Sequence, residues 1–268
     1  MNVRLPMGAI VLGVVIFLGS LVGGCGLLPE TKDETGNWSV ERIYQTGREA
    51  VQEGNYLRGI KMFETLESRY PYGPYAQQAV LQLAYANYKT GEMTAAVSAA
   101  DRFIKQYPNH ASVDYAYYLK GLANFNEDFG FLTFLANQDL SERDPKTLRE
   151  SYNAFRDLVA KFPESRYAGD SSARMRFLVN ALASGEVHVA RYYYNRGAFV
   201  AAASRAQSTV VTYPTAPVVE EALGVMVLAY DKLKLPELRD DARRVLEKNF
   251  PKSRYLAGED RSPWWKIW

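Results

Sequence analysis

The sequence predicts an all-α fold, an α-solenoid of five helix-turn-helix repeats, and two observations lead to this prediction. The first is an aromatic residue followed by proline, a pair that recurs at Tyr70-Pro71, Tyr107-Pro108, Phe162-Pro163, Tyr213-Pro214 and Phe250-Pro251. The second is that apolar residues recur every three or four positions, as in Leu81, Tyr85 and Tyr88. This spacing is the period of a helix face and not of a strand, and similarity at regular intervals is typical of repeat proteins.

Each repeat has a turn-forming residue seventeen positions before its closing proline. Three of these residues are glycines, Gly54, Gly91 and Gly197; the other two are Lys146 and Lys234, and each of these has a proline within two residues. A glycine can close a helix in the left-handed conformation, and the residue before a proline avoids the helical region. We therefore expect a first helix that ends at the turn and a second of about 14 residues that ends before the aromatic-proline pair.

The spacing of the closing prolines locates two insertions. Successive prolines are 37, 55, 51 and 37 residues apart, so the third and fourth repeats are longer than the others. In the third repeat we assign about 18 extra residues to the segment Asp128 to Pro145. In the fourth, about 14 extra residues extend the first helix, so that Arg174 to Arg196 forms one helix of some 23 residues.

Small residues recur at matching positions of the helices and resemble those of the tetratricopeptide repeat (TPR), where they let two helices approach closely. In the first helices these residues are Gly47, Ala84, Gly121 and Ala190, and in the second helices they are Gly59, Ala96, Ser151 and Ala202. The fifth repeat departs from the pattern with Arg239, which we interpret as a mark of an atypical capping repeat.

The N-terminus has the three parts of an export signal. Arg4 supplies positive charge, an apolar stretch from Ile10 to Val22 follows, and Gly23-Gly24 leads to the single cysteine, Cys25. The apolar stretch is shorter than the ~20 residues that span a bilayer. Leu21 to Cys25 resembles the bacterial lipobox, which implies cleavage after residue 24 and acylation of Cys25. The residue after this cysteine is Gly26 and not Asp, which in such lipoproteins implies that the anchor lies in the outer membrane.

Composition excludes several classes of function. With 32 basic and 30 acidic residues, the chain has no basic excess for nucleic acid. One cysteine and two histidines, His110 and His188, exclude a cysteine-rich zinc site and an intramolecular disulfide. Phosphate-binding loops and the Gly-x-Ser-x-Gly elbow are absent. We therefore expect a protein that is not an enzyme and that carries no metal or cofactor apart from the lipid on Cys25.

The fourth repeat carries a more specific resemblance. Glu186 to Tyr193, Arg196 to Ala202 and Arg205, together with Asn137 to Asp144 before the third repeat's second helix, are similar to the BamD (ComL) family. The similarity extends from Trp38 to about Gly258. It implies a lipoprotein of the outer membrane β-barrel assembly machine, anchored on the periplasmic face of the outer membrane. Its implied partners are the barrel subunit BamA, other lipoproteins of the machine and unfolded outer membrane proteins.

These observations divide the chain into five parts. We assign a signal peptide to 1–24, the lipidated cysteine and a flexible tether to 25–37, repeats one to three to 38–163, repeats four and five to 164–258, and a tryptophan-rich tail to 259–268. The tail segment Ser262 to Trp268 is interpreted as a disordered tail, an interfacial membrane contact or a docking peptide for another subunit.

The TPR resemblance also implies where contacts lie, because the first helices of such proteins line a concave face. The substrate-groove candidates are Tyr44, Arg48, Gln78, Tyr85, Tyr88, Lys89, Tyr115, Tyr118, Phe125 and Asn126. The rings suit the aromatic residues of unfolded barrel proteins, and Arg48 or Lys89 suits a terminal carboxylate. The alternative is that these rings pack between helices.

For the partner surface we select Arg191, Arg196 and Arg205, because an arginine fork can bind a carboxylate of the barrel subunit. The alternative is a solvated charged face. Tyr192, Tyr193 and Tyr194 are consecutive on one helix, so at least one must be exposed. Two other functions stay open: a stand-alone periplasmic TPR lipoprotein that binds peptidoglycan or peptide, and a cell-wall lytic enzyme.

Overall fold

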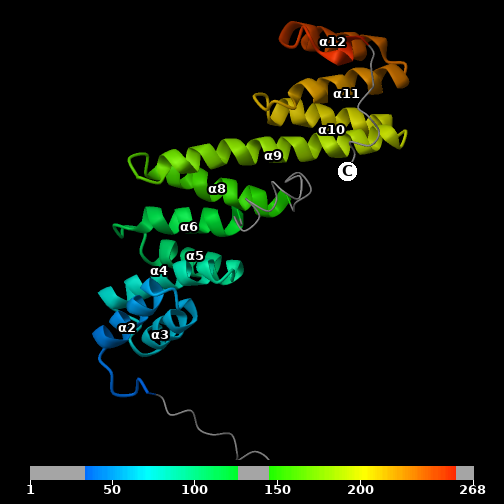
Figure 1. Ribbon diagram of the computed structural model, residues 1–268. Helices are drawn as coiled ribbons and strands as arrows, with labels where there is room; N and C mark the ends of the chain where they lie inside the picture. The colour runs from blue at the N-terminus through cyan, green and yellow to red at the C-terminus, as the bar shows by residue number, and fades with distance from the viewer. Residues whose placement is uncertain (1–33, 126–144, 258–268) are drawn as a thin grey trace, which may run out of the picture. The chain divides into compact units, whose positions relative to one another are not determined.

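The computed structural model describes residues 34–125 and 145–257, and these residues form helices joined by short turns. Within these two ranges there is no strand, so the predicted all-α class is confirmed (Figure 1). None of the helices in these ranges is both long enough and apolar enough to cross a membrane. The signal peptide, Cys25, Asn126 and the tryptophan tail, all singled out above, lie outside the described residues.

Within residues 34–125 and 145–257, ten helices form the five predicted pairs, and each helix packs on the next in chain order. First helices of neighbouring repeats also touch, as α2 touches α4, α4 touches α6 and α9 touches α11. A short 3-10 helix follows the last pair. The bounds are α2 Val40–Gln52 and α3 Tyr56–Arg69, α4 Pro74–Lys89 and α5 Met93–Gln106, α6 Val113–Phe125 and α8 Pro145–Lys161, α9 Ala168–Asn195 and α10 Phe199–Thr212, α11 Val219–Lys232 and α12 Pro236–Asn249, then η4 Arg254–Ala257.

Four of the five predicted turns are present, and each has its key residue in the left-handed region. The φ angles are 80° at Gly54, 81° at Gly91, 77° at Gly197 and 59° at Lys234. The second helix after each of these turns has 14 residues and ends just before the aromatic-proline pair, as predicted. Lys234 therefore adopts a left-handed conformation, which is unfavourable for a residue with a side chain but which glycine adopts easily.

The fifth predicted turn, at Lys146, was wrong. Lys146 is the second residue of α8, which begins at Pro145 and has 17 residues. A proline lacks only an N–H that the first helical position leaves unpaired in any case, so Pro145 starts the helix. The third repeat thus has a second helix three residues longer than the others, and the connection from α6 lies outside the described residues.

The long helix of the fourth repeat is confirmed. α9 is continuous over 28 residues, and it begins five residues after Pro163, at the same offset at which α6 follows Pro108. The prediction of 23 residues from Arg174 placed this start six residues too late. α9 has twice the 14 residues of α11, so the insertion of about 14 residues has lengthened a single helix.

The recurring small residues lie where paired helices meet. A Cβ on Gly47 would lie 2.8 Å from the Phe63 ring, and one on Gly121 would lie 2.4 Å from the Phe155 ring. The alanines at these positions are buried. Ser151 is also buried, and its hydroxyl donates a 2.9 Å hydrogen bond to the Gly121 carbonyl. The predicted close approach of the two helices is therefore confirmed.

The fifth repeat ends the stack with charges. Where α10 has buried alanines at 202, 203 and 206, α12 has Arg239, Asp240 and Arg243 thirty-seven residues later. Arg239 pairs with Asp240 at 2.8 Å and with Asp231 at 3.1 Å. The face that another helix would cover is thus polar, which supports the interpretation of a capping repeat.

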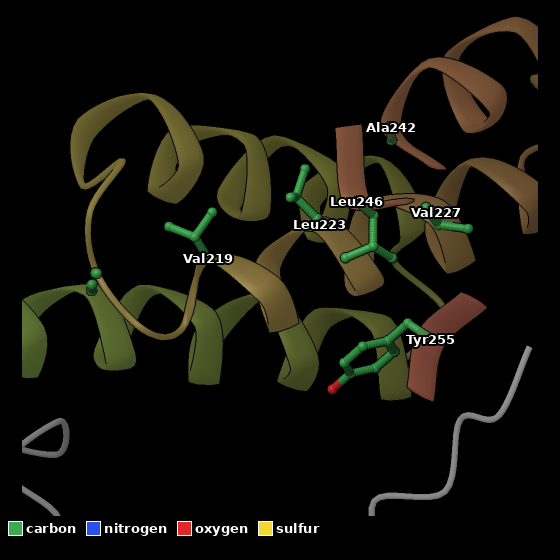
Figure 2. Packing of buried hydrophobic residues seen from close by; sticks show 8 residues of the cluster. Val219, Leu223, Val227, Ala242, Leu246 and Tyr255 are labelled. Atoms are coloured by element: carbon green, nitrogen blue, oxygen red, sulfur yellow. The ribbon is translucent and has the colours of Figure 1, made fainter. Parts of the chain in front are cut away.

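A short final segment covers part of that face. The Tyr255 ring of η4 packs against α11, where a Cβ on Gly224 would lie 2.3 Å from the ring. Figure 2 shows this ring beside the α11 cluster of Val219, Leu223 and Val227. The Arg243 guanidinium also donates to the Leu256 carbonyl at 2.7 Å. These contacts fix the chain as far as Ala257.

Candidate protein-binding surfaces

Most of the predicted groove rings pack between helices, as the alternative interpretation held. Tyr44 is only 6% exposed, and its ring centroid lies 5.3 Å from Tyr75 of α4 and 6.0 Å from Phe63 of α3. Burial raises the pKa of its hydroxyl. Tyr44 therefore joins the first two repeats and does not present its ring to a ligand.

The third repeat uses its rings in the same way. The Tyr118 ring stacks on Tyr167 with centroids 4.6 Å apart, and the Tyr115 ring lies 5.3 Å from Tyr167. Burial raises the pKa of Tyr115. Phe125 meets Phe177 of α9 edge to face at 5.7 Å. These rings connect α6 to α9 and the segment before it.

One carboxylate fixes this aromatic contact. The Tyr118 hydroxyl donates a 2.8 Å hydrogen bond to Asp170, which also accepts one from Arg174. Burial by itself would raise the pKa of Asp170, but the hydrogen bonds from Arg174 and Tyr118 outweigh it and lower the pKa below its ordinary value. The charged carboxylate therefore stabilises the junction of repeats three and four.

Three polar groove candidates remain exposed on the first helices, namely Arg48 on α2 and Gln78 and Lys89 on α4. Tyr85 is half-buried and meets Tyr56 edge to face at 6.3 Å. Tyr88 is also half-buried, beside the cluster around Leu122 and Phe155. The structure thus leaves accessible cations beside partly accessible rings on the first two repeats.

Two of the three partner-site arginines form ion pairs within the chain. Arg191 of α9 pairs with Glu221 of α11 at 2.9 Å. Arg205 of α10 pairs with Glu186 of α9 at 3.0 Å, and Arg149 of α8 approaches the same carboxylate at 3.8 Å. Glu186 therefore links three helices of the third and fourth repeats. Both arginines hold helices together in the free chain.

Arg196 differs from these two. Its guanidinium lies over the Tyr192 ring, 5.3 Å from the centroid, and no carboxylate of the described residues is within ion-pair distance. Tyr192 is 52% exposed, whereas Tyr193 and Tyr194 are half-buried. The prediction that one of these tyrosines is exposed is confirmed. Tyr192 and Arg196 form an open cation–aromatic pair at the end of α9.

A hollow beside Arg196 was missed by sequence reasoning. It has a volume of about 550 Å³ and is lined by Gly197 to Ala201, Ser204 and Leu233. Val200 at its edge is 69% exposed. The sequence held a signal for it, because α10 contains no acidic residue and its only basic residue is Arg205. An exposed helix face without charge suggests a contact surface.

The histidines form no reactive group with one another. The Nδ1 of His110 accepts a 3.0 Å hydrogen bond from the Ser112 backbone, and its ring meets Phe103 edge to face. His188 is exposed on α9. Over residues 34–125 and 145–257 no three acidic, histidine or cysteine side chains gather as a metal site would need. The candidate functional sites of the described residues are therefore the exposed surfaces of the first helices and the surface around Arg196.

Comparison with known proteins decides the family. The profile of the YfiO family, described as "Outer membrane lipoprotein", matches residues 37–246. The chain belongs to this family. The match covers all of the first four repeats and most of the fifth, so YfiO membership applies to the whole helical body.

Curated relatives in the YfiO family carry the name "Outer membrane protein assembly factor BamD". The protein of Neisseria meningitidis serogroup B is 48% identical over 95% of this chain and 98% of its own length. That of Xylella fastidiosa strain Temecula1 is 39% identical over 92% and 84%, and that of Vibrio cholerae is 31% identical over 86% and 94%. The resemblance to the BamD family is confirmed.

Solved structures show weaker likenesses. A thermophilic TPR protein of Thermus thermophilus covers 82% of this chain at 14% identity, with a TM-score of 0.36. A score this low does not bear on the fold, which rests on the helix packing described above.

Proposed function

We propose that this chain is a non-catalytic scaffold in the assembly of outer membrane β-barrel proteins. The observation that carries the proposal is its 48% identity, over nearly the full length of both chains, to a protein named as an assembly factor. A body built from stacked helix pairs suits this role, because successive repeats offer separate surfaces to separate partners. In this proposal it binds the barrel subunit, other lipoproteins of the machine and unfolded outer membrane proteins.

The proposed location is the periplasmic face of the outer membrane, with acyl chains on Cys25. The export signal, the lipobox-like segment and the family description support it. Several acyl chains give lasting attachment, because each buried methylene contributes about 0.8 kcal/mol. In a Cys25→Ala variant we expect the protein to leave the outer membrane fraction and to lose incorporation of labelled palmitate. Continued incorporation of labelled palmitate by the variant would refute lipid attachment at Cys25.

For the barrel subunit, Arg196 is the proposed contact within the fourth repeat. Its guanidinium is exposed and can form two parallel hydrogen bonds with a carboxylate. Arg191 and Arg205 support the surface indirectly in this proposal, because they hold α11 and α9 against their neighbours. Either arginine becomes a direct contact only if the partner displaces its internal carboxylate.

For unfolded barrel proteins, the proposed site lies on the first helices of repeats one and two. Arg48 and Lys89 supply exposed cations for a carboxylate, and the half-buried rings of Tyr85 and Tyr88 supply aromatic surface. Tyr44 packs between α2, α3 and α4 behind this surface, whereas the rings of the third repeat pack toward α9. Asn126 stays a prediction, since it lies outside the described residues.

Site-specific photo-crosslinking in living cells tests both surfaces. Crosslinkers at Tyr85 and Lys89 are expected to trap newly secreted barrel proteins, and one at Arg196 is expected to trap the barrel subunit. A crosslinker at Lys61, exposed on α3, is the matched control and should trap neither. Capture of one common partner from all three test positions would contradict the division. Recovery of peptidoglycan fragments without a barrel protein would favour a stand-alone lipoprotein.

A measurement of binding affinity tests whether Arg196 contacts the barrel subunit. We expect Arg196→Ala to weaken binding of the barrel subunit by about 10- to 100-fold, the worth of a charged hydrogen bond. Arg58→Ala, on the exposed side of α3, should leave binding unchanged. Circular dichroism of both variants should match that of the parent chain. Equal affinity of Arg196→Ala and the parent would remove Arg196 from the interface.

A further inference from the structure

The end of α9 and the start of α10 form an exposed surface with little charge. We call it the α10 patch, and it consists of Tyr192, Arg196 and the hollow lined by Gly197 to Ala201, Ser204 and Leu233. Its only charged member is Arg196. Val200 is 69% exposed and Tyr192 is 52% exposed. An apolar surface with a hollow and one cation calls for an apolar, aromatic occupant.

The outward faces of α3 and α12 are different. Lys61 and Glu64 are exposed on α3, and Asp241 and Arg244 are exposed on α12. An aromatic peptide would have to remove water from these charges in order to bind there, which costs free energy. The α10 patch carries no such cost, apart from an arginine that itself binds aromatic faces.

The chain contains a segment with the matching chemistry. Three of its four tryptophans lie in Pro263-Trp264-Trp265-Lys266-Ile267-Trp268, outside the described residues. Tryptophan is the ring that binds an arginine cation most strongly, and each such ring buries about 150–250 Å² of surface. A hollow of about 550 Å³ beside a guanidinium offers both kinds of contact.

The described chain ends close enough for this segment to reach the patch. Tyr255 of η4 is buried against Gly224 of α11, and Glu221 of the same helix pairs with Arg191 of α9 at 2.9 Å. Arg191 precedes Gly197 by six residues, about 9 Å along a helix. From Ala257 to Trp265 the chain has eight residues, which span up to about 27 Å when extended. The extended tail is thus about three times as long as the stretch of chain between Arg191 and Gly197.

We infer that the tail Ser262 to Trp268 docks on the α10 patch of its own molecule, with a tryptophan in the hollow and another against Arg196. The occupant is therefore a segment of this chain. The inference does not rest on the proposed function: the tail can dock in a protein that assembles nothing. Docking also places the tail on the arginine that we assign to the barrel subunit, so the two ligands would compete.

Fluorescence of the tail tests the inference in the full secreted chain. Cys25→Ser removes the lipid and Trp38→Phe leaves the three tail tryptophans as the only indoles. We expect their emission to be blue-shifted and several-fold protected from acrylamide. Val200→Asp should abolish both effects. The control is Val211→Asp, which lies on the same exposed face of α10, is 74% exposed and is eleven residues from Val200; it should change nothing.

A second measurement does not depend on a destabilising variant. A photo-crosslinker at Val200 should join to a peptide containing Trp264 to Trp268 within a single chain, and one at Val211 should not. Four results overturn the inference: unprotected tryptophans in the parent, equal effects of the two aspartates, protection that grows with protein concentration, or protection only on adding anionic vesicles. The third result would indicate a second copy as the occupant, and the fourth a membrane.

Discussion

Repeats one and three fill the space between their two helices differently from repeats two and four. In one and three, a glycine of the first helix faces a phenylalanine of the second, Gly47 with Phe63 and Gly121 with Phe155. At the equivalent positions, repeat two has Ala84 and Ala100, and repeat four has Ala190 and Ala206, all fully buried. What all four repeats share is a small residue, glycine or alanine, at the first-helix position, whereas the facing residue of the second helix varies from alanine to phenylalanine.

The largest expected effect on stability comes from truncating the phenylalanine of a glycine–phenylalanine pair. Phe155 is fully buried, so Phe155→Ala should lower the free energy of unfolding by about 3–5 kcal/mol. Urea denaturation of the purified chain measures this loss. Ala206→Gly in the fourth repeat should cost only about 1 kcal/mol, the effect of glycine in a helix. Equal losses in the two variants would contradict the contrast between the repeats.

Converting the third repeat to the alanine–alanine type sharpens the comparison. Gly121→Ala alone should lose about 1–3 kcal/mol, because its methyl group would overlap the Phe155 ring. In the Phe155→Ala background the same change should instead gain about 0.8 kcal/mol, since the methyl group fills part of the cavity. A double-mutant cycle in urea measures this reversal of sign. Additive effects would show that the two residues are not a pair.

The turns give a smaller contrast between the fourth and fifth repeats. Gly197→Ala should lose about 1–2 kcal/mol, because φ is 77° and a left-handed conformation costs a side chain about that much. Lys234→Gly should be neutral or gain up to about 1 kcal/mol, since relief of its φ of 59° is partly offset by glycine's greater freedom in the unfolded chain. Thermal unfolding of both variants measures the difference. A loss of stability in Lys234→Gly would assign that side chain a contact.

The smallest expected effect is pH-dependent and lies at the junction of repeats three and four. The pKa of Asp170 is lowered in the folded chain, so its charged form stabilises the fold above an ordinary carboxyl pKa of about 4. That stability is lost as the pH falls through the lowered value. Because Asp170 is exposed, we expect no more than about 1 kcal/mol.

Comparing the acid sensitivity of Asp170→Asn with that of the parent measures this contribution. The variant should have lower stability at neutral pH and lose less of it on acidification. Glu164→Gln, also exposed, serves as the control for removal of one carboxylate and should follow the parent. Identical acid profiles of all three proteins would show that the Tyr118–Asp170 contact contributes nothing measurable.

The sequence was most informative where structure is set locally. The left-handed glycines and the prolines that end second helices act on their own backbone, so residues such as Gly91 and Pro108 predicted element boundaries. The predicted turn at Lys146 is absent because a proline can either end a helix or begin one. Only the structure shows that Pro145 begins α8. Local patterns thus predicted the fold and four of its five turns, and failed at the one turn where proline begins a helix.

The candidate site was less predictable, because each side chain's partner is distant in sequence. Tyr118 rests on Tyr167, and Arg191 pairs with Glu221 thirty residues away. No periodicity fixes such pairs, so an arginine chosen as a partner contact proved to have an internal carboxylate. Cys25 and the tail lie outside the described residues and stay predictions.

The uninterrupted α9 connects two neighbourhoods that otherwise share few contacts. Its first turns hold Asp170 and Phe177 against the third repeat, and its last turns carry Tyr192 and Arg196 beside α10. With 28 residues it is about 42 Å long, and no break interrupts it. Because the Arg191–Glu221 and Glu186–Arg205 ion pairs hold α9 to its neighbours, this single helix sets the separation between the third repeat and the end that carries Arg196.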